Sequence, residues 1–392
     1  MSRELGVSIV GAGMTRFGER FDAGYEELAA DAYRACLESS GGRIDGERLE
    51  AAWLSTALGG LIRREAVTGA SLADPLRFFP KPVTRVENAC AGGSDAIRNA
   101  AFAVAAGVYD VVLVLGVEKM RDIPTRASLI AQRGQMSHLW WHPRGASSPY
   151  LFAQHATVHM ERNGMTREHL ARVARKNRHH GSLNPNAFMR REIEIDDVLD
   201  APMVCSPLGL LDCCPTTDGA AALVLARSDI AAELTDAPVE LAGLGLATDV
   251  PYSHWKPSFE YQPAPTRAAE VAFEMAGIAP SDVDVAELHD CFSVAELLAY
   301  EDLGFCGRGE ASRWIESGAP ALGGELPCNP SGGLLAKGHP IGATGVAQMA
   351  EVFWQLRDEA GERQVAGAQI GLTHNVGGNG QVCCVNVARR AR

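Results

Sequence analysis

The sequence predicts an α/β fold made of two similar halves, with an insertion in the first half. The chain has 392 residues, which is more than one hydrophobic core usually serves. Apolar spacing and short apolar runs give the same order of elements twice. A helix, a strand and a second helix are expected at residues 25–39, 51–54 and 92–106, and again at 266–276, 283–288 and 343–356.

Short runs rich in Val, Leu and Ala mark the strands of the predicted sheet. They contain few polar residues, which is typical of strands covered on both faces. Four clear runs occupy residues 7–10, 111–115, 220–225 and 382–387, and residues 368–372 form a weaker fifth.

The stretch from Glu118 to about Asp200 has a different character. It is rich in Arg and interrupted by Gly, Ser and Pro, and we expect one helix in it, at residues 167–177. Segments of this kind carry substrate contacts more often than core residues. The sequence therefore predicts an inserted loop domain that rests on the first half.

Charge and cysteine usage exclude several classes of protein. The net charge is -12, whereas a general nucleic-acid binder needs a basic face. The 10 cysteines include no C-x-x-C pair, so neither a metal site nor a disulfide scaffold is expected. A reducing cytoplasm fits this pattern. We expect no signal peptide and no membrane span, since no apolar run approaches ~20 residues.

Cys90 is the first candidate catalytic residue. The sequence ACAGGS places it between a strand and a long helix of small residues. Unpaired N–H groups and the dipole at a helix N-terminus lower the pKa of a thiol and raise its reactivity. The alternative is a buried cysteine that packs as a small apolar side chain. Gly92 and Gly93 leave room for a substrate, but the spacing alone does not decide between the two readings.

The sequence HDCF places His289 and Cys291 directly after a predicted strand. Open α/β sheets have their sites at the carboxyl ends of strands. Alternate residues of an extended segment also project to the same side. A single histidine here would more often be structural, but the paired thiol favours a catalytic site.

Two glycine-rich segments complete the candidate site. In NPSGGLLAKGHPIGATG, closely spaced Pro and Gly fix a loop that holds His339 near the start of a helix. This segment lacks the spacing of a phosphate-binding loop. The segment HNVGGNG predicts a turn whose backbone N–H groups face an oxyanion, with a plain hairpin as the alternative. The early GAGMTR has Arg16 where a dinucleotide-binding motif needs glycine, so we reject that fold.

Taken in order, ACAGGS, HDCF, NPSGGLLAKGHPIGATG and HNVGGNG resemble the thiolase superfamily over essentially the whole chain, and the sterol-carrier-type thiolases in particular. The resemblance implies a thiolase-like duplicated α/β/α/β/α five-layer sandwich with an inserted loop domain, usually as a homodimer. The implied division is an N-terminal half at 1–118 and 200–232, the inserted loop domain at 119–199 and a C-terminal half at 233–392.

The resemblance also implies roles for four side chains. Cys90 would be the acylated nucleophile, and His339 would activate it. Cys291 would be the general acid and base. His289 would share with His339 the oxyanion site for the thioester enolate. Cleavage of a 3-oxoacyl-CoA needs such a set, because a nucleophile, an enolate site and a proton donor must meet.

One departure from ordinary thiolases concerns the second catalytic cysteine. Where those enzymes have a C-x-G motif, this chain has His374, Asn375 and Val376. The acid and base role therefore passes to Cys291. The backbone N–H groups of Cys90 and Val376, with that of Gly377, would hold the second oxyanion, and His374 and Asn375 are expected in the substrate pocket.

The implied activity is thiolytic cleavage of a 3-oxoacyl-CoA, or the reverse Claisen condensation, by an acyltransferase of lipid metabolism. Coenzyme A would be a cosubstrate, with no permanently bound cofactor and no metal. A ketoacyl synthase would not need Cys291, and a retro-aldolase of sterol side-chain degradation would not need Cys90. An accessory subunit that only presents acyl-CoA is a further alternative, and a small acyl-CoA-binding accessory protein is a candidate partner beside the homodimer.

Overall fold

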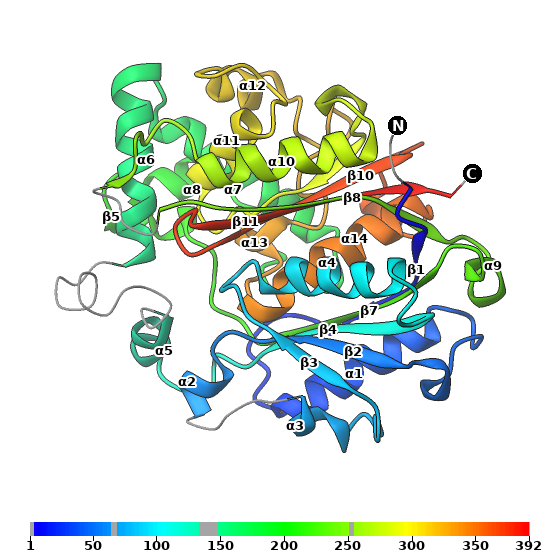
Figure 1. Ribbon diagram of the computed structural model, residues 1–392. Coiled ribbons are helices and arrows are strands. Elements are labelled where there is room, and N and C mark those ends of the chain that lie inside the picture. The colour runs from blue at the N-terminus through cyan, green and yellow to red at the C-terminus, as the bar shows by residue number, and fades with distance from the viewer. Residues whose placement is uncertain (1–3, 64–68, 133–146, 251–254, 392) are drawn as a thin grey trace.

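The computed structural model describes residues 4–63, 69–132, 147–250 and 255–391 (Figure 1). Its strands form one nine-stranded sheet in the order β3-β2-β4-β7-β1-β8-β11-β10-β9. The first five strands of this order come from the first half of the chain and the last four from the second half. The strands are β1 Val7–Met14, β2 Ala51–Ser55, β3 Val83–Val86, β4 Val111–Glu118, β7 Gly219–Arg227, β8 Val239–Thr248, β9 Val285–Glu287, β10 Ile370–Gly377 and β11 Val382–Arg390.

The two halves of the sheet are joined only briefly. Strand β1 pairs with β8 only at Ser8 and Ile9, whereas it pairs with β7 from Val7 to Met14. Strand β8 pairs with β11 over most of its own length. The strands therefore separate into two layers, which Figure 1 shows one above the other.

Helices cover both outer faces of these layers and fill the space between them. The central helices α4 (Gly92–Ala105) and α14 (Thr344–Leu356) each contact strands of both halves. Helix α1 (Tyr25–Glu38) covers the outer face of the first layer, and α10 (Pro263–Ala276) covers that of the second (Figure 1). The predicted duplicated five-layer sandwich is confirmed.

Glycines allow the outer helix of the second half to approach its sheet closely. A Cβ on Gly243 would lie 2.2 Å from the carbonyl oxygen of Ala272, and one on Gly245 only 1.9 Å from that of Ala268. Helix α10 therefore rests directly on the backbone of β8. These small residues also explain why β8 was not predicted, because its β-branched residues, which identify a strand, are confined to its two ends, at Val239 and Thr248.

The clear apolar runs and the predicted helices agree with observed elements to within a few residues. The segment HNVGGNG differs from the prediction. Its residues His374 to Gly377 belong to strand β10, and Gly377 pairs with Val382 of β11. Only residues 378–381 form the turn. The backbone from His374 to Gly377 thus lies in the sheet, not in a glycine-rich loop.

The described parts of the insertion are mostly helical, where the sequence predicted one helix. These parts form α5, α6, α7 and α8, and they contact α11, α12 and α13 of the second half more than the first half. Residues 133–146 lie outside the described residues. The apolar side chains Phe152 and Leu170 join the core of the second half. The helices of this region are α5 Thr125–Gln132, α6 Ser148–Asn163, α7 Arg167–Ser182, α8 Ile195–Leu199, α11 Ser293–Asp302, α12 Ala311–Ser317 and α13 Gly333–Ala336.

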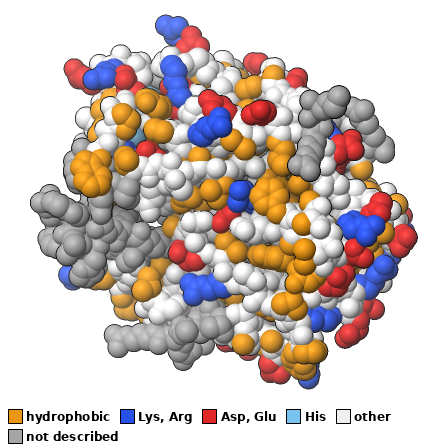
Figure 2. Space-filling model, in the orientation of Figure 1, with side chains coloured by type: hydrophobic (Ala, Val, Ile, Leu, Met, Phe, Trp, Pro, Cys, Tyr) orange, Lys and Arg blue, Asp and Glu red, His pale blue; other side chains and the backbone are white. Residues whose placement is uncertain are grey.

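Short elements complete the fold. These are α2 Gly59–Arg63, α3 Ala70–Ala73, α9 Ala231–Leu234, β5 Met203–Cys205 and β6 Leu208–Gly209. On the face shown in Figure 2, acidic and basic side chains are interspersed among the described residues, in line with the scattered charge of the sequence. Among the helices that the structure describes, none has the length and apolarity required to cross a membrane.

Candidate active site

Cys90 lies in a tight turn between β3 and α4. Ala89 adopts a left-handed conformation with φ of 51°, and its carbonyl oxygen accepts a hydrogen bond from the Gly92 N–H at 3.1 Å. A Cβ on Gly93 would lie 2.9 Å from the Val346 nitrogen of α14. Glycine therefore lets the first turns of α4 and α14 meet next to Cys90.

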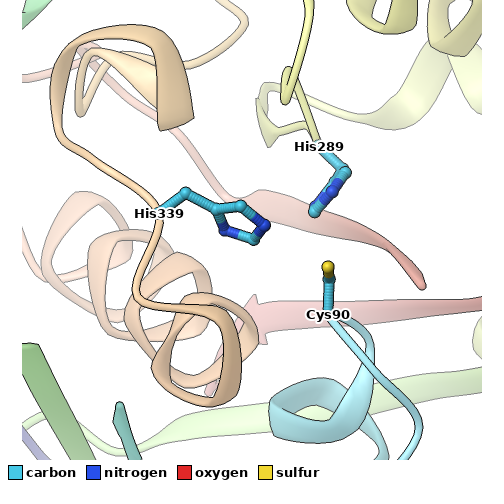
Figure 3. A group of neighbouring side chains, drawn as sticks. All are labelled: Cys90, His289 and His339. Atoms are coloured by element: carbon cyan, nitrogen blue, oxygen red, sulfur yellow. The ribbon is translucent and has the colours of Figure 1, made fainter. Parts of the chain in front are cut away.

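Two histidines from the second half converge on this thiol. His289 follows β9, and His339 lies between α13 and α14. Figure 3 shows the three side chains pointing toward one another from separate segments. One ring nitrogen of each histidine and the Cys90 sulfur all lie within 4.8 Å of one another. The imidazole centroids are 5.1 Å apart at an interplanar angle of 81°.

The pKa of Cys90 does not fall as the helix N-terminus predicted. Although part of the residue reaches solvent, protein surrounds its sulfur, and this desolvation raises the pKa of the thiol to about 12. A backbone N–H of Gly378 opposes the shift, and the carboxylate of Glu118 adds to it. Desolvation therefore outweighs the helix end. The resting site contains a neutral thiol that needs a base.

His339 can act as that base because of its contact with Thr344. The Nδ1 atom lies 2.7 Å from the Thr344 Oγ1 atom, and this hydroxyl donates its one hydrogen to the Pro340 carbonyl oxygen at 3.1 Å. The hydroxyl can then only accept from the imidazole, so Nδ1 carries the ring hydrogen. Burial lowers the pKa of His339 to about 3. Its Nε2 atom therefore presents a lone pair at neutral pH.

His289 is held from behind by strand β10. The Asn375 Nδ2 atom lies 3.1 Å from the His289 Nδ1 atom, and the backbone N–H of His289 donates to His374 Nδ1 at 3.4 Å. Both residues of β10 are buried, with 0% and 2% exposure for Asn375 and His374. We expected them in the substrate pocket, and the structure places them in the layer that supports His289.

Cys291 lies close to Cys90 in a group of three thiols. Its carbonyl oxygen accepts the backbone N–H of Cys214 at 3.0 Å, and the neighbouring Cys213 pairs with Phe292 as in a short antiparallel ladder. Burial, followed by the nearby Cys214 and Cys90, raises the pKa of Cys291 well above its ordinary value. Cys214 was missed by sequence reasoning, since only the fold brings its segment to HDCF.

A backbone donor reaches the nucleophile from the turn after β10. The N–H that contacts the Cys90 sulfur belongs to Gly378, next to Val376 and Gly377, which remain the predicted donors to the oxyanion. A Cβ on Gly377 would lie 2.5 Å from the Asn88 carbonyl oxygen. The end of β10 thus presses against the nucleophile turn at Gly377 and offers its N–H one residue later.

Glu118 is a buried carboxylate that joins the two halves near the site. It is fully buried at the end of β4. Its oxygens accept from the Thr56 hydroxyl at 2.9 Å, from the Ala57 and Leu58 N–H groups at 2.8 and 3.0 Å, and from the Gly342 N–H at 3.0 Å. A carboxylate at a strand end is the sequence signal that could have drawn attention to it.

Buried charges anchor the loop that carries His339. Lys337 Nζ lies 2.7 Å from the Ser331 hydroxyl and 3.2 Å from Glu287. Asp290, next to His289, accepts the N–H groups of Leu334 at 2.6 Å and of Leu335 at 3.1 Å at the start of α13. Each histidine of the site is therefore adjacent to a buried residue that holds this loop.

The same three atoms of Cys90, His289 and His339 have the element types of zinc ligands. They are the one such group found among the described residues, and they offer three ligands where a structural zinc site needs four. A metal there would occupy the lone pair of the Cys90 sulfur. The geometry suits either a bound ion or a free nucleophile, but not both together.

The similarity of this chain to known proteins agrees with the geometry of the site. The family model described as "Thiolase, N-terminal domain" matches residues 7–229, and "Thiolase C-terminal domain-like" matches residues 245–390. The acetyl-CoA acetyltransferase of Methanothermobacter thermautotrophicus is 41% identical over 98% of this chain and 99% of its own length. Human sterol carrier protein 2 is 36% identical over 96% of this chain and 70% of its own length.

A solved structure described as the Ltp2-ChsH2(DUF35) aldolase is similar over 100% of both chains, with a TM-score of 0.87 and 25% identity. Together the two family models span most of the chain, and the relatives cover it almost from end to end. The fold, the four motif residues and these matches lead to one conclusion: the chain belongs to the thiolase family and is an acyltransferase.

Proposed function

We propose that the enzyme cleaves a 3-oxoacyl-CoA, or forms it in the reverse direction, through an acyl group carried on Cys90. The observation that carries this is the convergence of Cys90, His289 and His339 within 4.8 Å. His339 Nε2 takes the thiol proton as the sulfur attacks the keto carbon. The bond between the α and β carbons then breaks, and its electron pair forms the enolate of the departing thioester.

The two oxyanions have separate sites. The N–H groups of Cys90 and of the end of β10, at Val376, Gly377 and Gly378, face the oxygen of the attacked carbonyl. The contact of the Gly378 N–H with the Cys90 sulfur supports this placement. His289, together with His339 after it has taken the proton, faces the enolate oxygen. Fixed N–H donors of this kind supply a large part of the rate enhancement of acyl-transfer enzymes.

Cys291 completes the cycle as acid and base. Its thiol gives a proton to the enolate carbon, and the thiolate that remains takes the proton of the incoming coenzyme A. The coenzyme A sulfur then attacks the acyl group on Cys90 and releases the nucleophile. The proximity of Cys291 to Cys90 supports this role. Coenzyme A is a cosubstrate, and we expect no permanently bound cofactor.

The experiment that tests this function is acyl transfer to Cys90. Incubation with acetyl-CoA, which the relative's name suggests, should leave one acetyl group on the peptide that contains Cys90, and coenzyme A should then remove it. A thiolysis panel of short, long and sterol-derived 3-oxoacyl-CoAs would identify the acyl chain. Failure of every donor to acylate Cys90 would contradict the proposal.

A retro-aldolase on this scaffold is the second candidate, because the similar solved structure is described as an aldolase. That reaction would need no acyl group on Cys90. The name of that aldolase also includes a second component, ChsH2(DUF35), which supports an accessory protein as a candidate partner here. All 10 cysteines are unpaired, which supports our proposal of a reducing cytoplasm.

A further inference from the structure

A neutral imidazole carries one ring hydrogen, and its position decides whether His289 can donate to an enolate oxygen. The pKa of His289 lies well below its ordinary value because of burial and the nearby His339 and His374. At neutral pH the ring is therefore neutral. It can serve as a donor toward the site only if the hydrogen is on Nε2, since Nδ1 faces Asn375 at 3.1 Å.

The surroundings of Asn375 fix the orientation of its amide. A Cβ on Gly345 would lie 2.3 Å from the Asn375 Oδ1 atom, and 2.4 and 2.5 Å from the backbone nitrogen and hydroxyl of Ser94. The amide oxygen therefore lies between the first turn of α14, at Gly345, and the first turn of α4, at Ser94.

The Asn375 Oδ1 atom is buried there and has no hydrogen-bond partner among the described residues, and the positive ends of two helix dipoles favour an oxygen at this position. A reversed amide would place its partly positive NH2 group against both helix N-termini. The NH2 group therefore points to His289, and Nδ1 of that ring must accept. The ring hydrogen is left on Nε2.

We propose that Asn375 is a positioning residue that holds His289 as the Nε2–H tautomer and so makes it a permanent donor to the enolate oxygen. The inference rests on the proposed function and adds a residue to it. Thr344 fixes the opposite state in His339, where Nδ1 carries the hydrogen and Nε2 is bare. One neutral histidine is thus a donor and the other a base before any proton has moved.

The test replaces Asn375 by Asp, which has the same shape but can only accept. Neutral His289 would then carry its hydrogen on Nδ1 and present a lone pair to the enolate. Exchange of the methyl protons of acetyl-CoA in deuterated water measures enolate formation directly. We expect this exchange to fall about 10²-fold at mildly alkaline pH, the effect of losing one oxyanion donor. Acetylation of Cys90 should stay within a few-fold of the parent.

The pH dependence gives a signature that a purely structural role would not produce. The titratable groups that face His289 are His339, His374 and Cys90. A carboxylate at position 375 favours the charged imidazole and raises its pKa. Below that pKa both ring nitrogens carry hydrogen, so Nε2–H returns. The ratio of Asn375→Asp exchange to parent exchange should therefore rise as the pH is lowered.

The matched control is Asn386→Asp on the adjacent strand β11. Asn386 is also fully buried, but its amide donates to the Ser94 carbonyl oxygen at 3.2 Å and contacts no histidine of the site. The exchange ratio of this variant should not rise toward acid pH. Parent-like exchange by Asn375→Asp, or the same acid rise in Asn386→Asp, would overturn the inference.

Two outcomes keep the inference separate from the proposed function. If the parent does not acetylate Cys90, the proposed function fails first. If the Asp variant fails to fold, Asn375→Ser takes its place, because a serine hydroxyl is too short to reach Nδ1. Its exchange should fall at least tenfold at every pH while Cys90 still acetylates, and parent-like exchange in this variant would refute the role of Asn375.

Discussion

At the scale of single residues, catalysis depends on the protonation state of the Cys90 thiol. Its pKa is raised to about 12 and that of His339 is lowered to about 3, so both groups are neutral at rest. The thiolate forms as the sulfur attacks, with the proton passing to Nε2 in the same event. This arrangement protects the resting thiol from other electrophiles and still provides a nucleophile when a substrate is present.

We predict that His339→Ala slows alkylation of Cys90 by iodoacetamide at neutral pH. Without the imidazole no group takes the thiol proton, and burial keeps the thiol neutral. The measurement is the rate of labelling of the Cys90 peptide by mass spectrometry. His169→Ala in α7, whose imidazole contacts Glu316, is the control and should label as the parent does. Unchanged labelling of His339→Ala would remove the base role.

We predict that Cys291→Ala still accepts an acyl group on Cys90 but does not complete the cycle. Nucleophile activation belongs to His339, whereas proton transfer to the enolate belongs to Cys291. Loss of a general acid and base lowers turnover by about 10²–10⁴-fold, and labelled acyl-enzyme should accumulate. Cys384→Ala, which removes a buried thiol of β11, is the control. Normal turnover by Cys291→Ala together with loss of activity in Cys384→Ala would reverse the assignment.

The catalytic side chains of the site could be predicted from the sequence more completely than the residues that hold them in position. Cys90, His289, Cys291 and His339 sit in short motifs whose local context is visible in the chain. The contact of Asn375 with the His289 imidazole was not visible, because it depends on how β10 packs, and no local pattern encodes a contact between residues 86 positions apart. Thr344 is only 5 positions from His339, but their contact depends on the turn between them, which the sequence pattern does not define.

At the scale of elements, Glu118 shows how a strand end can hold a distant loop. Four hydrogen-bond donors converge on its two oxygens. One of them, the Gly342 N–H, belongs to the loop that leads from His339 into α14. The carboxylate thus connects the end of β4 to the loop that leads from His339 into α14. The position of this loop depends on both Glu118 oxygens accepting hydrogen bonds.

We predict that Glu118→Gln destabilises the protein and weakens catalysis. The glutamine NH2 group must face two of the four donors whichever way the amide turns. A buried donor left without a partner costs about 1–3 kcal/mol, and the Gly342 loop should shift with it. Thermal unfolding and turnover report the two effects. Glu274→Gln, at an exposed carboxylate of α10, should change neither, and a parent-like melting temperature for Glu118→Gln would contradict this account.

Helices and strands could be predicted from the sequence where a local pattern of apolar residues determines them. Runs of Val, Leu and Ala identified β1, β4, β7 and β11. Apolar spacing also identified α7 in the insertion. Strand β8 and the insertion helices α5, α6 and α8 escaped, because contacts such as those of α10 with the glycines of β8 and of α6 with α11 determine them. Tertiary contact there overrides weak local preference.

At the scale of the whole molecule, the insertion links the halves instead of covering one of them. Its helices α6 and α7 contact α11 of the second half, while the chain enters and leaves the insertion from strands of the first half. We propose the division into 1–118 with 200–232, 119–199 and 233–392 as units of sequence, with the insertion packed on the C-terminal half. Its contacts place it beside the segment that carries His289 and Cys291.

The last prediction concerns the open edge of the sheet. Strand β3 pairs only with β2 and ends the sheet on the side of the first half, and β3 leads directly into the turn that carries Cys90. An open edge presents unpaired backbone groups to another chain. We propose that two copies pair through their first halves at this edge. Sedimentation at micromolar concentration should then give twice the 41.7 kDa of the single chain.

Thr84→Lys tests the position of this contact. Thr84 is exposed on β3, and a two-fold axis would bring two lysines together, so like charges should weaken the dimer. The control Val108→Lys adds the same charge at a residue that is 61% exposed and lies in the turn after α4, outside the edge strand β3. We expect the Thr84 variant to shift toward 41.7 kDa and the control to remain paired. A parent that sediments as a single chain would count against the homodimer, whereas a dimer unaffected by Thr84→Lys would place the contact on another surface.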